Sequence, residues 1–192
     1  MKSQGLQIPV GNTVTIGRVA GMIVANTTVY NDSGTGVGTF QNLGSFVLKG
    51  KSLLTIGDRL KIHTWGKFPA QTVLSFVVAE VDVNGVSLVG TAHGSLVSVA
   101  PVVATDALVW EIDIDMVASV IGASGVLLYT ACLSITDTGA ASINDKIQVG
   151  NASVTLDLTA DQTFQVKSKV TGTGGTPWAT EYALLCDYNP VP

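Results

Sequence analysis

One segment, residues 53–66, constrains the fold more than any other part of the chain. It places a Gly-Asp turn before a stretch of alternating residues, in which Leu60 and Ile62 would share one face of a strand and Lys61 and His63 the other. A Trp-Gly pair follows, and we expect it to close this strand. Alternation with a period of two indicates a half-buried β-strand, so the segment predicts an all-β chain.

Strand patterns of the same kind recur after residue 40, separated by turn residues, and no amphipathic helix of ten residues or more is found. The strands are predicted at 43–48, 59–65, 72–83, 86–91, 107–117, 125–137, 148–158, 163–170 and 180–187. In the third of these, Val81 and Val83 are expected on one face against Glu80 and Asp82 on the other. Asn84-Gly85 is typical of a type I′ hairpin turn.

One-sided alternating strands favour antiparallel pairing. Eight or nine short strands fit an antiparallel double-sheet jelly-roll sandwich, and an immunoglobulin-like sandwich is the nearest competitor. The first 28 residues are different, because they are apolar and glycine-rich and carry no charge after Arg18. Such a segment cannot fold alone, so it should add a strand to the body or lie along another chain. We therefore predict an extended N-terminal arm, residues 1–28, and one β-sandwich domain, residues 29–192.

The composition bears on the partners of the protein. Charged residues make up 12% of the 192 residues, about half the usual globular fraction, and apolar residues make up 46%. The net charge is −4 and the ten Lys and Arg form no cluster, so no nucleic-acid partner is expected. A surface of hydroxyls and amides with few charges suits extended contacts with other protein chains.

No membrane or secretory segment is expected. The chain begins without the apolar core of a signal peptide. Residues 116–136 carry no charge, but Gly122-Ala123-Ser124-Gly125 interrupts them, which indicates a loop followed by a strand.

The two cysteines, Cys132 and Cys186, both fall inside strand patterns, and we interpret them as buried reduced thiols, with a disulfide left open. No metal site is predicted, since structural sites usually need three or four Cys and His ligands at close spacing.

Three acidic residues, Glu111, Asp113 and Asp115, would line one face of a strand. This pattern is compatible with a calcium site or with an acid pair for glycoside hydrolysis. We favour the solvated face of an alternating strand, because alternation alone produces the pattern. The histidines His63 and His93 lack a G-x-S-x-G signature nearby, so we predict no catalytic residue, no enzyme activity and no cofactor.

Aromatic residues offer a second kind of candidate site. The glycine-rich stretch 172–177 lacks the lysine and helix of a phosphate loop, so it is predicted to be a flexible loop. Trp178 follows it, and Trp178 with Tyr182 could contact a glycan or a protein partner. Trp110 lies within a predicted strand and is assigned to the core.

The segment 44–68 also carries a family resemblance. Its strand, leucine-rich edge, Gly-Asp-Arg-Leu-Lys-Ile run and Trp-Gly pair resemble jelly-roll decoration (cement), head-fibre and tail-associated virion proteins of tailed bacteriophages. Val29-Tyr30-Asn31-Asp32 and the strand after Trp178 also fit, whereas Ile56 stands where the family usually has Asn before Gly-Asp.

The resemblance implies a virion structural protein, commonly a homotrimer, without catalytic residues. We expect a capsid decoration protein, made in the cytoplasm of a bacterial host, that lies on the capsid surface, binds the major capsid protein and stabilises the shell. The arm would make the capsid contact through Leu6, Ile8, Val10, Val14 and Ile16. The alternative is a receptor-binding or carbohydrate-binding module of a tail or head fibre, which would use Trp178 and Tyr182.

Overall fold

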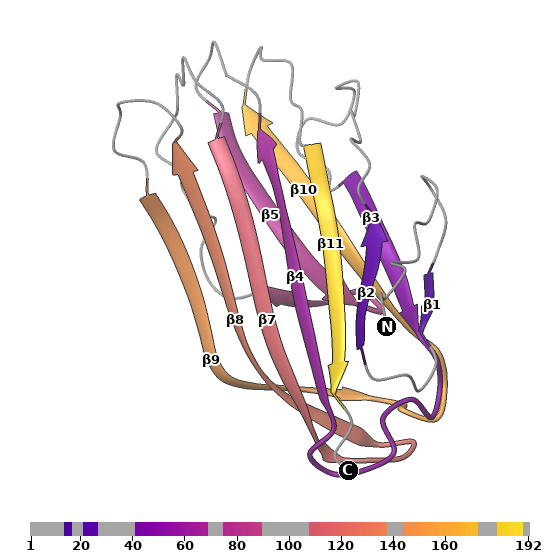
Figure 1. Ribbon diagram of the computed structural model, residues 1–192. Helices are drawn as coiled ribbons and strands as arrows, with labels where there is room; N and C mark the ends of the chain where they lie inside the picture. The colour runs from indigo at the N-terminus through magenta and orange to yellow at the C-terminus, as the bar shows by residue number, and fades with distance from the viewer. Residues whose placement is uncertain are drawn as a thin grey trace.

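The computed structural model describes residues 14–16, 21–26, 41–68, 75–89, 108–137, 144–172 and 180–189. Every regular element in these ranges is a β-strand, as Figure 1 shows, so the all-β prediction is confirmed. None of the described residues forms a helix long and apolar enough to cross a membrane. The strands are β1 (Val14–Ile16), β2 (Gly21–Asn26), β3 (Gln41–Leu48), β4 (Arg59–Phe68), β5 (Ser75–Val83), β6 (Val86–Val89), β7 (Leu108–Val120), β8 (Gly125–Asp137), β9 (Asn144–Leu156), β10 (Gln162–Gly172) and β11 (Thr180–Asn189).

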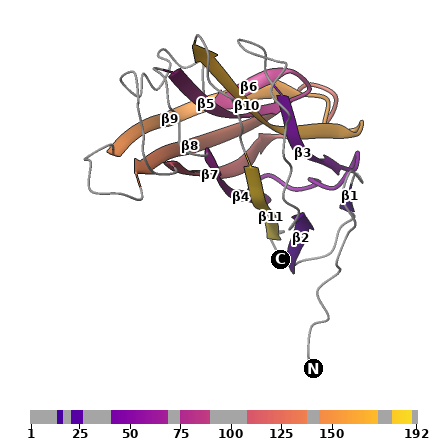
Figure 2. The same ribbon diagram turned by 90° about the horizontal axis from the view of Figure 1, so that it is seen from above.

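The described strands form two sheets, which Figure 2 shows as two layers. One sheet has the order β1-β3-β10-β5-β6, and the other has the order β2-β11-β4-β7-β8-β9. All pairs are antiparallel except β1, which runs parallel to β3. The arrangement is consistent with the predicted sandwich.

The strands pair in a nested order along the chain. β2 pairs with β11, β3 with β10, β4 with β7 and β5 with β6. Two more pairings, β11 with β4 and β10 with β5, join these pairs within each sheet. The strands β8 and β9 are not part of these four nested pairs. They form a hairpin that extends the six-stranded sheet beyond β7.

The core lies between the sheets, and β7 illustrates how the sequence builds it. Its inward residues are fully or almost fully buried; they are Trp110, Ile112, Ile114, Met116 and Ala118. As predicted, Glu111, Asp113 and Asp115 alternate with them on the outward face. In the other sheet, Phe46 and Phe164 stack with ring centroids 4.7 Å apart. Aromatic rings bury large areas and contribute strongly to such cores.

The segment 53–66 folds largely as predicted. Gly57 has a φ of 99°, and the buried Asp58 carboxylate accepts hydrogen bonds from the backbone N–H groups of Leu54 (2.9 Å) and Thr55 (3.0 Å). The prediction that the Trp-Gly pair closes the strand is wrong, since β4 continues to Phe68. Gly66 has ladder partners on both sides, in β7 and β11, and these partners keep the strand extended.

Other turns and strand ends can be compared with their predicted positions in the same way. Asn84 and Gly85 have φ of 47° and 83°, which confirms the predicted type I′ turn. β8 has the predicted bounds, whereas β7 runs three residues beyond its predicted end at Val117 because its ladder with β8 continues to Val120. Residues 121–124 form the turn that was expected within the uncharged run 116–136.

Part of the predicted arm is hydrogen-bonded to the body. β2 lies beside β11, with Met22 opposite Asp187, and β1 lies beside β3. The arm residues Val14 and Ile16 therefore stand opposite Phe46 and Leu48. The remaining predicted contact residues of the arm lie outside the described residues; they are Leu6, Ile8 and Val10.

The two faces of β5 differ in polarity, as expected, but both of them are buried. Val81 and Val83 are fully buried, but Glu80 and Asp82 on the opposite face are only 6% and 1% exposed. Asp82 forms an ion pair with Lys167 of the neighbouring β10. A buried carboxylate needs such a partner, because its desolvation otherwise costs several kcal/mol.

Neither cysteine forms a disulfide. Cys186 is buried, as predicted, whereas Cys132 is partly exposed. The prediction of a buried thiol at 132 is wrong because this residue pairs with Asp113 and shares its outward face of the sheet.

Candidate functional site

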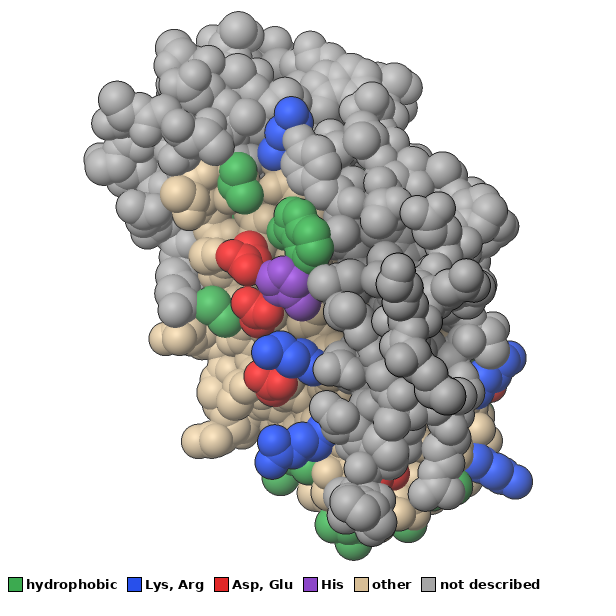
Figure 3. Space-filling model, in the orientation of Figure 1, with side chains coloured by type: hydrophobic (Ala, Val, Ile, Leu, Met, Phe, Trp, Pro, Cys, Tyr) green, Lys and Arg blue, Asp and Glu red, His purple; other side chains and the backbone are tan. Residues whose placement is uncertain are grey.

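The outer face of the six-stranded sheet carries the polar side chains of β4 and β7. Their register places His63 opposite Asp113, Lys61 opposite Asp115 and Trp65 opposite Glu111. Directly opposite residues on one face of an antiparallel pair have side chains close enough to interact. Figure 3 shows the result as a histidine beside acidic side chains, with basic side chains below them.

Three of these side chains form a compact group, which we call the His63 cluster: His63, Glu111 and Asp113. The Nδ1 atom of His63 lies 2.7 Å from Oδ1 of Asp113 and 3.7 Å from Oε1 of Glu111. The three ligand atoms all lie within 4.8 Å of one another. The side chains are 29%, 48% and 45% exposed in the order His63, Glu111, Asp113, so solvent reaches the cluster.

Neighbouring residues hold the cluster in place. The ring of Trp65 packs against the imidazole of His63 at a centroid distance of 4.7 Å and a tilt of 40°. On the other side of β7, Cys132 of β8 stands opposite Asp113. All three cluster residues lie on strands with ladder partners on both sides, so their backbone positions are fixed by the sheet.

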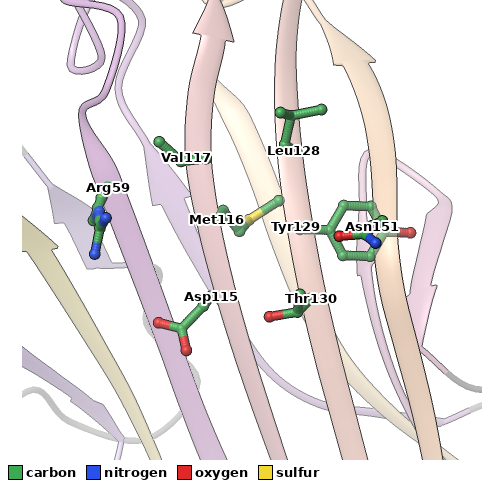
Figure 4. A pocket seen from close by; sticks show the side chains of 8 residues that line it. All are labelled: Arg59, Asp115, Met116, Val117, Leu128, Tyr129, Thr130 and Asn151. Carbon is green, nitrogen blue, oxygen red and sulfur yellow. The ribbon is translucent and has the colours of Figure 1, made fainter.

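Two hollows lie near the cluster, and the first of them includes the cluster residue Asp113. One is lined by Asp113, Asp115, Thr130, Ala131, Cys132, Gln148, Val149 and Gly150. The other, drawn in Figure 4, is lined by Arg59, Asp115, Met116, Val117, Leu128, Tyr129, Thr130 and Asn151. Asp115 and Thr130 line both hollows. Burial raises the pKa of Tyr129 above its ordinary value of 10.0.

The arrangement changes how the acidic row is interpreted. Glu111, Asp113 and Asp115 do share the outer face, and they are half-exposed or exposed, as expected for a solvated face. What the sequence did not reveal is the imidazole beside Asp113, because His63 is 50 residues away along the chain. Alternation predicted the face of each residue, but it held no information on the pairing of β4 with β7.

The predicted aromatic site falls largely outside the described residues. Trp178 is not among them, and Tyr182 is described only as a backbone position in β11.

A second exposed feature lies at the lower end of the sandwich in Figure 1. The loop before β4 and the turn between β7 and β8 lie at that end. Four large apolar side chains of this loop, this turn and the adjoining end of β7 are exposed, and we call them the apolar end: Leu54 (41%), Ile56 (63%), Val120 (45%) and Ile121 (42%). Hydrogen bonds from Gly57 N to Ala118 O (2.8 Å) and from Ala118 N to Asp58 O (2.9 Å) join the 53–58 loop to the end of β7. The two segments that bear these side chains are thus hydrogen-bonded to each other through their backbones.

Comparison of the chain with protein-family models, with curated proteins and with solved structures finds no match. The phage-protein resemblance of residues 44–68 therefore remains a prediction.

Proposed function

We propose that this chain is a jelly-roll subunit that docks onto a larger protein assembly, and that this assembly is the head of a tailed phage. The exposed apolar end carries the docking part of the proposal. The jelly roll is supported by the strand pairing, and the choice of a phage head comes from the sequence resemblance.

A jelly roll consists of eight antiparallel strands that form two interlocked Greek keys. It results when the first strand pairs with the eighth, the second with the seventh, the third with the sixth and the fourth with the fifth, with successive pairs alternating between two sheets. With β2 as the first strand and β11 as the eighth, the pairs β2–β11, β3–β10, β4–β7 and β5–β6 follow this rule. In this scheme β1 and the β8–β9 hairpin are additions at the sheet edges.

The apolar end favours a docking role. Large exposed side chains that gather on a monomer commonly mark an interaction surface. Here the turns that bear them are braced by backbone hydrogen bonds, so little conformational entropy is lost when a partner binds. Each of these side chains is already about half buried, so covering the remainder stabilises a complex by about 1 kcal/mol per side chain.

On a phage head the proposed role is mechanical. Copies of the chain, arranged as trimers, bridge neighbouring subunits of the major capsid protein through the apolar end and the arm residues Leu6, Ile8 and Val10. Specific interfaces of this kind bury about 1,200–2,000 Å² in total. Because bound copies stabilise only the assembled shell, many modest contacts raise its resistance to internal pressure.

The test is sedimentation of the purified full-length chain with emptied heads of the phage that encodes it. Val120→Ser and Val109→Ser form a matched pair, since both residues are exposed valines of β7 and only Val120 belongs to the apolar end. We expect Val120→Ser combined with Ile56→Ser to weaken binding at least tenfold, or about 1.4 kcal/mol, while Val109→Ser binds normally. Failure of the unmodified chain to sediment with heads would contradict the proposal.

The contribution of the arm needs a separate variant. Deletion of residues 1–28 would remove β2, which pairs with β11, and would disturb the body itself. Leu6, Ile8 and Val10 are therefore replaced together by Ser in the full chain. Weaker head binding with an unchanged melting temperature is expected if the arm contacts the shell, and unchanged binding would assign the contact to the apolar end alone.

A further inference from the structure

We propose that the His63 cluster is a binding site for a divalent first-row transition metal, with Zn²⁺ as its typical occupant. This proposal does not depend on the role of the chain in an assembly. It rests on three ligand atoms from two neighbouring strands, on their spacing and on their charge.

The donor set decides which class of metal fits. One imidazole nitrogen and two carboxylates are ligands that Zn²⁺ and its first-row neighbours accept. Calcium and magnesium are hard cations that prefer oxygen ligands alone, and calcium takes six to eight of them. The histidine between the two carboxylates therefore favours a transition metal over either hard cation.

The spacing fits such a metal with small side-chain movements. Two ligand atoms bound at about 2.1 Å to a tetrahedral metal lie about 3.4 Å apart. The Nδ1 atom of His63 is 2.7 Å from the Asp113 oxygen and 3.7 Å from the Glu111 oxygen, so the two distances bracket this value. The first distance must lengthen by about 0.7 Å and the second shorten by about 0.3 Å, and the two carboxylate oxygens, which lie within 4.8 Å of each other, must approach by up to about 1.4 Å. Rotation of the two exposed carboxylates supplies such changes, while the imidazole keeps its packing against Trp65.

Charge supplies a separate argument. Glu111 and Asp113 project from the same face of β7 two residues apart, where two carboxylates repel each other. A protonated imidazole balances only one of them, whereas a divalent cation with neutral imidazole balances both. Lys61 stands opposite Asp115, the next acidic residue along the strand, rather than opposite either cluster carboxylate.

The site would be open rather than closed. Three protein ligands leave at least one coordination position of the metal for water or for a donor from another molecule. The thiol of Cys132 is a good zinc ligand and stands opposite Asp113, but it is not among the atoms that converge within 4.8 Å. Cys132 thus serves as a control for the ligand assignment.

Calorimetric titration of the chelator-treated full-length chain with ZnCl₂ tests the proposal, with CaCl₂ as the comparison. We expect one saturable Zn²⁺ site per chain and no comparable Ca²⁺ binding. His63→Ala and Asp113→Asn should each weaken Zn²⁺ binding at least tenfold. Asp115→Asn and Cys132→Ser, which alter the nearest other carboxylate and thiol of the face, should leave it within about twofold.

Co²⁺ gives a second readout, because its visible absorption reports the ligands directly. The unmodified chain and Cys132→Ser should give the same Co²⁺ spectrum, and His63→Ala should give none. Circular dichroism of each variant establishes that its fold is intact. The proposal is overturned if Zn²⁺ does not saturate a single site, if Ca²⁺ competes equally, or if Cys132→Ser removes binding as effectively as His63→Ala does.

Discussion

The strands β5 and β7 carry the same alternation of acidic and apolar residues, yet the acidic face is buried in β5 and exposed in β7. In β5 the sequence Glu80-Val81-Asp82-Val83 is buried on both faces. In β7 the corresponding stretch, residues 111–116, buries only its apolar face and leaves the acidic face to solvent. One pattern in the sequence thus leads to a buried ion pair in one sheet and to an exposed cluster in the other.

Alternation along a strand predicts the face of each residue but not its burial. A period of two assigns residues to the same or opposite faces of a strand, because successive side chains point to opposite sides. It does not say what covers each face. The partners of the acids also differ, since Asp82 pairs with Lys167 of β10 whereas Asp113 pairs with His63 of β4.

The largest effect is expected from breaking the buried pair. Asp82→Ala leaves Lys167 without its carboxylate and should lower the free energy of unfolding by about 3 kcal/mol. Asp115→Ala, in the exposed acidic row, should change it by less than about 0.5 kcal/mol. Urea denaturation of the two variants measures the difference, and equal effects would mean that burial of Asp82 is not the distinction between the strands.

A double variant tests whether the loss of the ion pair explains this instability. Replacing a buried pair by apolar residues of similar size is often neutral or stabilising. Asp82→Leu combined with Lys167→Met should therefore recover most of the stability that Asp82→Ala loses. A double variant as unstable as the single one would indicate that Asp82 acts through its other contact, the hydrogen bond from Gly85 N at 3.3 Å.

A somewhat smaller loss is expected at Asp58, a third buried carboxylate, which is held by backbone donors. Asp58→Ala removes the acceptor for the N–H groups of Leu54 and Thr55 and should cost about 2 kcal/mol. Asp58→Asn keeps one side-chain oxygen and should lose less than half of that. Melting temperatures of the two variants test this expectation, and equal losses would contradict it.

The exposed cluster should matter little for stability until a metal is present. Without metal, His63→Ala is expected to cost about 0.5 kcal/mol, as for a surface pair. With Zn²⁺ at a hundred times its dissociation constant, the unmodified chain should gain about 2.7 kcal/mol and the variant should gain nothing. Thermal denaturation with Zn²⁺ or with a chelator measures both values, and an equal gain by the variant would speak against the cluster.

The smallest effect concerns Asp161 in the exposed turn between β9 and β10. Its carboxylate accepts hydrogen bonds from Lys49 Nζ at 2.6 Å and Gly50 N at 2.9 Å, and these lower its pKa below the ordinary 3.8. Because the folded pKa is the lower one, the stabilisation is complete above pH 3.8 and is lost as the pH falls below it. Asp161→Asn should therefore be slightly less stable than the unmodified chain at pH 7 and should converge with it in acid.

Much of the fold could be predicted because it depends on local patterns. The inward residues of β4 and β7, the Asn84-Gly85 turn and the Gly-Asp turn before β4 each follow from neighbours along the chain. The extension of β4 through Gly66 could not be predicted in this way, because ladder partners on β7 and β11 keep it extended.

The candidate site was less predictable than the fold for the same reason. Glu111 and Asp113 could be assigned to one face, but the neighbour that turns two carboxylates into a ligand set comes from a strand 50 residues away. The burial of Glu80 and Asp82 likewise depends on tertiary packing. Pairing between distant strands is thus the information that one-dimensional periodicity lacks.

If the chain is a phage-head subunit as proposed, an electron cryo-microscopy map of the intact particle that carries it is the most direct test. We expect density for a two-sheet sandwich on the outside of the head, with Leu54, Ile56 and Val120 facing the shell. A head surface without such density, or a bound sandwich whose apolar end faces solvent, would contradict it.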